Sequence, residues 1–199
     1  EGSMRRVGNE QEIRALFREL RVSTADSATL NILPDSLTEL VFQTAQRAFQ
    51  GTSVTAILRT IQKPIIAIVS QETIDNIESS RSGSMNFDSR VLTVGLYLSG
   101  TNLCLISEDA GRMRDPASSV IEFQRLLTHT TGHEVGHYIM YNLHDTRSIL
   151  FRSNNVLAIA NKLTWLDEGA TEYMTVESFD TKTCEIVRVG LDSASSCSY

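Results

Sequence analysis

Two histidines and a glutamate stand close together within residues 130–140, Thr-Thr-Gly-His-Glu-Val-Gly-His-Tyr-Ile-Met, as His133, Glu134 and His137. If this stretch is helical, the two histidines lie one turn apart on the same face, so both imidazoles can bind one metal ion. Glu134 is then near enough to accept a proton from a water bound to that ion. The spacing His-Glu-x-x-His therefore predicts a zinc site that activates water.

A catalytic zinc ion usually takes three protein ligands and keeps one position for water, so a third ligand must come from elsewhere in the chain. We expect this ligand to be Glu168, because residues 138–167 leave room for a loop and a returning helix. Glu172 follows one helical turn later on the same face. Its carboxylate is placed to accept the second ring N–H of a zinc-bound histidine, His133 or His137.

The segment around Glu168, Trp165-Leu166-Asp167-Glu168-Gly169, resembles the third-ligand segment Trp-Leu-Asn-Glu-Gly of the zinc aminopeptidases, with aspartate in place of asparagine. Together with His-Glu-x-x-His, it is similar to the gluzincin metallopeptidases, the group that includes thermolysin. The resemblance runs from His129 to Met174 and implies zinc held by His133, His137 and Glu168. It also implies that Glu172 takes the place of the thermolysin aspartate that orients a zinc-bound histidine.

The resemblance has one departure that bears on specificity. The zinc aminopeptidases carry a Gly-x-Met-Glu-Asn segment whose glutamate holds the free amine of the substrate. Residues 83–87, Gly-Ser-Met-Asn-Phe, lack that glutamate. We therefore expect an endopeptidase that hydrolyses a protein or peptide substrate, with zinc polarising the carbonyl and Glu134 as the general base.

Peptide hydrolysis passes through an oxyanion, which needs a hydrogen-bond donor besides zinc. Four side chains near the two motifs are candidates, and the sequence does not rank them: Tyr138, Tyr141, His144 and Tyr173. Two other functions stay open at this point, a secreted effector or toxin protease specific for one host protein and a non-catalytic zinc-stabilised binding domain. Glu134 argues against the second, because a structural zinc site needs no base.

Composition bounds the remaining function classes. The 199 residues are 41% hydrophobic and 21% charged, which suits one compact domain with a substantial core. A net charge of -6 argues against nucleic acid as the main partner, since phosphate binding needs a basic surface. The sequence has no apolar run of about 18 residues that predicts a membrane span. Its 3 cysteines have neither a disulfide framework nor zinc-ligand spacing.

Hydrophobic periodicity predicts an N-terminal helical scaffold over residues 4–62 and a catalytic region over residues 63–199, after a cloning remnant at residues 1–3. Helices are expected at residues 10–21 and 34–50, joined by a polar connection at 23–31, and a short helical piece at 53–62. Residues 71–80 predict a weak helix or turn.

Three apolar runs, at residues 64–70, 91–98 and 103–106, predict strands, and the last two form a hairpin around a Ser-Gly turn. Asp115 and Pro116 begin a long helix that carries the motif to about residue 143. Helices at 148–162 and 165–179 and a strand at 183–189 follow. The sequence thus predicts an α+β, zincin-like metallopeptidase domain whose small mixed sheet packs on the active-site helix. The hairpin is the edge at which an extended peptide would pair.

Replacing Glu168 tests the choice of third ligand. We expect Glu168→Ala to lose tightly held zinc, because two histidines alone do not complete a catalytic zinc site. Metal analysis of the purified variant after dialysis measures this. Full zinc content in the variant would show that another residue is the third ligand.

Overall fold

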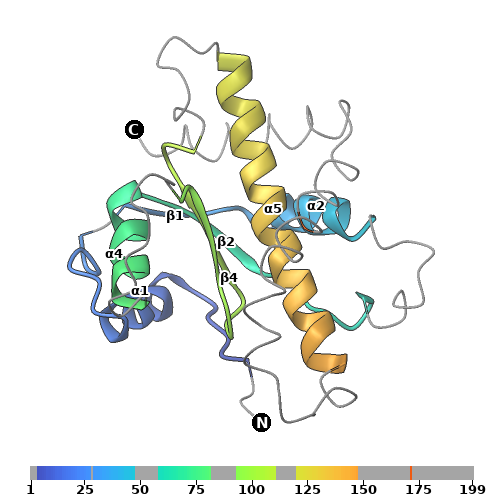
Figure 1. The fold of residues 1–199 in the computed structure, drawn as a ribbon, viewed down its shortest axis with the longest axis horizontal. Helices are drawn as coiled ribbons and strands as arrows, with labels where there is room; N and C mark the ends of the chain where they lie inside the picture. The colour runs from blue at the N-terminus through green and yellow to red at the C-terminus, as the bar shows by residue number, and fades with distance from the viewer. Residues whose placement is uncertain are drawn as a thin grey trace, which may run out of the picture.

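The structure is a computed structural model that describes residues 4–27, 29–47, 58–81, 93–110, 120–147 and 171, with the side chains of α5 described over residues 128–142. The elements in these residues are, in order, α1 (Glu10–Glu19), β1 (Leu30–Ile32), α2 (Asp35–Gln46), β2 (Ile65–Val69), α4 (Gln71–Arg81), β3 (Gly95–Leu98), β4 (Leu103–Ser107) and α5 (Val120–Arg147). Figure 1 shows α1 and α4 on one side of the strands and α2 and α5 on the other.

The strands form one mixed sheet in the order β1-β2-β4-β3. The neighbours β2 and β4 run parallel, whereas β1 pairs antiparallel with β2 and β3 pairs antiparallel with β4. The predicted hairpin is confirmed, and its turn contains Gly100 with φ of 81°, a left-handed conformation that glycine adopts without steric cost. Within the described residues, β3 is therefore the edge strand beside β4.

Alternation along the central strands divides the core into two clusters, because successive side chains of a strand point to opposite faces. Cys104 and Ile106 of β4 face α2 and α5, while Leu103 and Leu105 face α1 and α4. All four side chains are fully buried. A strand that is covered on both faces explains why these runs are continuously apolar.

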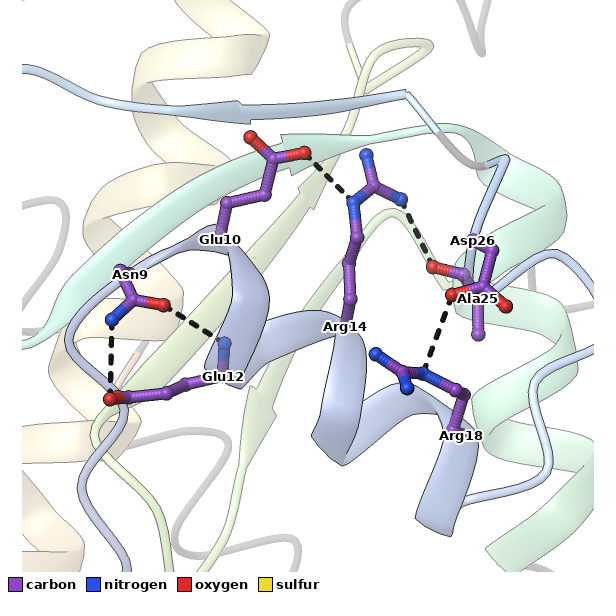
Figure 2. A network of polar contacts seen from close by, with 7 residues as sticks. All are labelled: Asn9, Glu10, Glu12, Arg14, Arg18, Ala25 and Asp26. Atoms are coloured by element: carbon purple, nitrogen blue, oxygen red, sulfur yellow. Dashed lines mark hydrogen bonds and ion pairs between the residues drawn. The ribbon is translucent and has the colours of Figure 1, made fainter.

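The helix α1 is fixed at both ends by polar contacts that Figure 2 shows. Asn9 is its N-cap, and its side-chain oxygen accepts the backbone N–H of Glu12 at 3.0 Å. Arg14 donates to the carbonyl of Ala25 at 3.0 Å, which holds the chain after the helix against it. The buried face of α1, with Ile13, Leu16 and Phe17, then covers one side of the sheet.

Several predicted boundaries differ from the structure. Part of the expected connection at residues 23–31 is a strand, since Leu30 and Asn31 belong to β1 and pair with Val69 and Ile68. The segment before residue 62 is therefore not only helical. The motif helix continues to Arg147 rather than residue 143, and the weak helix or turn at residues 71–80 is the helix α4.

The coarse fold class is confirmed: an α+β arrangement with a small mixed sheet packed against α5. No helix among the described residues is long and apolar enough to cross a membrane. The start of the motif helix at residues 115–119 lies outside the described residues. So do the predicted helix at 148–162, the strand at 183–189 and, apart from Thr171, the helix at 165–179.

Asn102 fastens the N-terminal segment to the sheet, and its replacement should destabilise the fold. Its side chain accepts the backbone N–H of Val7 at 2.8 Å and donates to the carbonyl of Val7 at 3.0 Å. Because both residues are buried, we expect Asn102→Ala to lower the free energy of unfolding by about 2–4 kcal/mol. Urea unfolding measures this. An unchanged midpoint in Asn102→Ala would contradict the assignment.

Candidate metal and catalytic site

The two motif histidines meet on α5, as the spacing predicts. Their Nε2 atoms lie 3.0 Å apart, and the ring planes are inclined by 84° with centroids 4.6 Å apart. Both side chains are half-buried. One turn of helix separates His133 from His137, so the regular backbone of α5 alone brings the two nitrogens together.

The separation of these nitrogens suits a shared zinc ion. Two ligands at about 2.05 Å on a tetrahedral zinc ion lie about 3.3 Å apart, so the pair needs only a small adjustment. A hydrogen bond between one ring N–H and the other ring nitrogen fits the same distance, with the roles set by the tautomers. The geometry of the histidine pair is therefore compatible with two ligands of one metal ion.

The second motif segment reaches the first at Thr171. This residue is helical and fully buried, and its Oγ1 lies 3.4 Å from Nδ1 of His137. A histidine that binds metal through Nε2 carries a proton on Nδ1 and donates it to a neighbouring oxygen. Thr171 is close enough to accept that proton, and the direction of the hydrogen bond depends on the tautomer of His137.

Glu134 turns away from the histidine pair toward the sheet. Its carboxylate is buried, and Oε2 accepts the backbone N–H of Tyr97 on β3 at 2.6 Å. The register pairs Tyr97 with Cys104, yet the N–H of Tyr97 points away from β4, since backbone groups along an antiparallel strand alternate in direction. Glu134 thus caps the outer edge of β3 with a charge-assisted hydrogen bond.

The thiol of Cys104 ties the same turn of α5 to β4. It lies 3.6 Å from the carbonyl oxygen of Glu134, as a weak donor to the helix backbone. Complete burial raises the pKa of the Cys104 thiol, and the nearby carboxylate of Glu134 raises it further. The group therefore stays protonated, and its role is packing.

Tyr138 is a core residue. Its ring is fully buried between Phe42 and Tyr97, with centroids 6.3 and 5.7 Å away, and its hydroxyl donates to the carbonyl of Gln62 at 2.6 Å. Burial raises the pKa of Tyr138 to about 12. The hydroxyl of Tyr138 is thus engaged with Gln62, and the role of Tyr138 as an oxyanion donor stays a prediction.

Tyr141 is the more accessible of the two helix tyrosines, with 38% of its surface exposed. Its ring packs edge-on against Tyr97 with centroids 5.6 Å apart. Its hydroxyl lies near the turn between β3 and β4, 3.9 Å from where a β-carbon on Gly100 would be, and its role as a donor stays a prediction.

For the other site residues that the sequence predicts, the structure describes no side chain. Glu168, Glu172 and Tyr173 are outside the described residues, and for His144 only the backbone position in α5 is described. Among the side chains that the structure describes, no three His, Cys, Asp or Glu residues group closely enough to hold a metal ion. The prediction of Glu168 as third ligand thus stays untested.

Three residues of the site were not foreseen: Gly95, Tyr97 and Thr171. A β-carbon at position 95 would lie 2.5 Å from Oε1 and 2.7 Å from Cγ of Glu134. One signal in the sequence points to this position, because an isolated glycine within a strand pattern indicates a close approach of another group. The other two contacts depend on a backbone N–H and on tertiary packing, for which the sequence has no marker.

Comparisons of the chain with protein-family models, with curated proteins and with solved structures found no match.

Tyr138→Phe separates packing from catalysis. We expect it to lower the free energy of unfolding by about 0.5–1.5 kcal/mol, because the hydrogen bond from the Tyr138 hydroxyl to the carbonyl of Gln62 is lost. We expect no more than a twofold change in the rate of peptide cleavage. Thermal unfolding and a cleavage assay measure the two effects, with Tyr141→Phe as the matched variant. A large loss of cleavage in a stably folded Tyr138→Phe would support its role as a donor.

Proposed function

We propose that the protein is a zinc-dependent endopeptidase with a zincin-like catalytic domain, in which His133, His137 and Glu168 bind the metal. The observation that carries the proposal is the contact between Thr171 and His137, at 3.4 Å. It joins the two segments that the sequence singles out for chemistry. Glu168 and Thr171 are three residues apart, so on a helix they share a face, and a residue of that face already touches a histidine ligand.

The residues that would hold zinc are His133, His137 and Glu168, and a metal bound there would lower the pKa of its water and polarise the scissile carbonyl. The chain's own residues do the remainder. The carboxylate of Glu134 has two oxygens, so Oε2 can keep the N–H of Tyr97 while the group accepts a proton from water. The same carboxylate then returns the proton to the leaving amine.

The substrate that we propose is an extended peptide lying beside the motif helix, with its scissile bond between Glu134 and the histidine pair. Within the described residues, the outward N–H of Tyr97 on the edge of β3 is held by Glu134, so this N–H does not pair with the peptide. Tyr141 lies beside Tyr97 on this edge and is our candidate for stabilising the oxyanion.

One observation favours a second function, a zinc-stabilised binding domain without catalysis. The bond from Tyr97 to Glu134 is a structural contact, so the presence of Glu134 does not by itself require a base. The histidine pair would then link segments of the fold. The two functions predict different effects on the rate of peptide cleavage when the charge of Glu134 is removed.

A pair of variants tests the peptidase proposal. Glu134→Gln should keep zinc, because Glu134 contacts β3 rather than the metal ligands, and should lose at least 10²-fold in cleavage rate. His133→Ala should lose both zinc and cleavage, because a ligand is gone. Zinc content and cleavage of a broad peptide library are measured on each purified variant.

The result that would contradict the proposal is full zinc with near-normal cleavage in Glu134→Gln. A wild-type protein that binds zinc tightly but cleaves no peptide would favour the binding domain.

A further inference from the structure

We infer that Gly95 is a positioning residue: because it has no side chain, the Glu134 carboxylate can lie against the edge of β3. This steric requirement at position 95 follows from the geometry of the described residues. Only its effect on cleavage rests on the proposed peptidase function.

The space over Gly95 is already filled by Glu134. A β-carbon at this position would lie 2.5 Å from Oε1 and 2.7 Å from Cγ of Glu134, and 2.7 Å from Cγ2 of Thr130. These separations are well inside van der Waals contact, so an added methyl group must displace the carboxylate or move the helix. Any residue other than glycine therefore disturbs the position of Glu134.

The backbone conformation at position 95 does not require a glycine. Among the described glycines only Gly100 has a positive φ, so alanine can adopt the backbone conformation of Gly95. What position 95 requires is the absence of a side chain. Gly95 and Tyr97 lie two residues apart on the face of β3 toward α5. Gly95 leaves the space that Glu134 fills, and Tyr97 donates its backbone N–H to Oε2 of Glu134 at 2.6 Å.

A second glycine provides a matched comparison within the same chain. Gly8 donates its backbone N–H to Oε2 of Glu12 at 2.6 Å, and a β-carbon there would lie 3.5 Å from that oxygen. That distance is ordinary contact. Gly8→Ala therefore adds the same methyl group near a hydrogen-bonded carboxylate without displacing it.

The first measurement does not depend on peptidase activity. It is the melting temperature of Gly95→Ala, of Glu134→Ala and of the double variant, all with Thr130→Ser to remove the third contact. We expect Gly95→Ala to lower the melting temperature by roughly 5 °C where Glu134 is present. In the Glu134→Ala protein the decrease should shrink by at least half, because the methyl group no longer meets the carboxylate. The control cycle, Gly8→Ala with Glu12→Ala, should show no such coupling.

The second measurement is the cleavage rate at equal zinc content. We expect Gly95→Ala to keep zinc and lose about 10²-fold in rate, because a misplaced base works poorly. Adding Glu134→Gln should then cost much less than it costs in the protein with Gly95, since both changes disable the same group. A glycine that served only substrate binding would give losses that multiply.

The outcomes are distinguishable. Equal decreases in melting temperature with and without the Glu134 side chain would overturn the inference that Gly95 leaves space for Glu134, whatever the activity. If the effects of Gly95→Ala and Glu134→Ala on stability are coupled but the protein cleaves no peptide, the steric role of Gly95 is supported and the peptidase is rejected. If the effects on stability are coupled but the losses in cleavage rate from Gly95→Ala and Glu134→Gln multiply, Gly95 does not position Glu134 for catalysis.

Discussion

The hydrogen bond between the backbone N–H of Tyr97 and the carboxylate of Glu134 joins two groups that would each be costly alone. An edge-strand N–H that is buried under a helix has no ladder partner, and a buried carboxylate needs donors to stay charged. Their pairing removes both penalties at once. It also fixes which turn of α5 lies over β3, and hence where the neighbouring His133 stands.

Because of this arrangement, one short stretch of α5 has side chains in two environments, the buried core and the half-buried face with the two histidines. Val135, Tyr138 and Ile139 point into the core shared with α2 and the sheet, where all three are fully buried. His133 and His137, at helical positions rotated away from that face, stay half-buried. A helix that is apolar on one side and carries the two histidines on another must be held at a fixed rotation about its axis. The contacts from Glu134 to β3 and from Cys104 to the Glu134 carbonyl provide that.

The sequence predicted what periodicity and local spacing determine, namely the hairpin, the central strands and the pairing of the motif histidines. It did not predict β1, because Leu30–Ile32 is three residues long and becomes a strand only through its partner β2. It also could not separate Tyr138 from Tyr141 as possible donors. The hydroxyl of Tyr138 is taken by Gln62, which is 76 positions away in the chain. Such a contact depends on tertiary structure.

The contact at Thr171 shows how the two chemical segments depend on each other. From the sequence we expect Glu172 to accept a ring N–H of His133 or His137, and Glu172 lies outside the described residues. Within the described residues, Thr171 approaches Nδ1 of His137. The Thr171 hydroxyl is neutral, so its contact with His137 joins the two segments without adding a charge. If Glu168 is the third ligand, binding the metal also binds the second segment to α5. Zinc would then complete the fold at the same point where it completes the site.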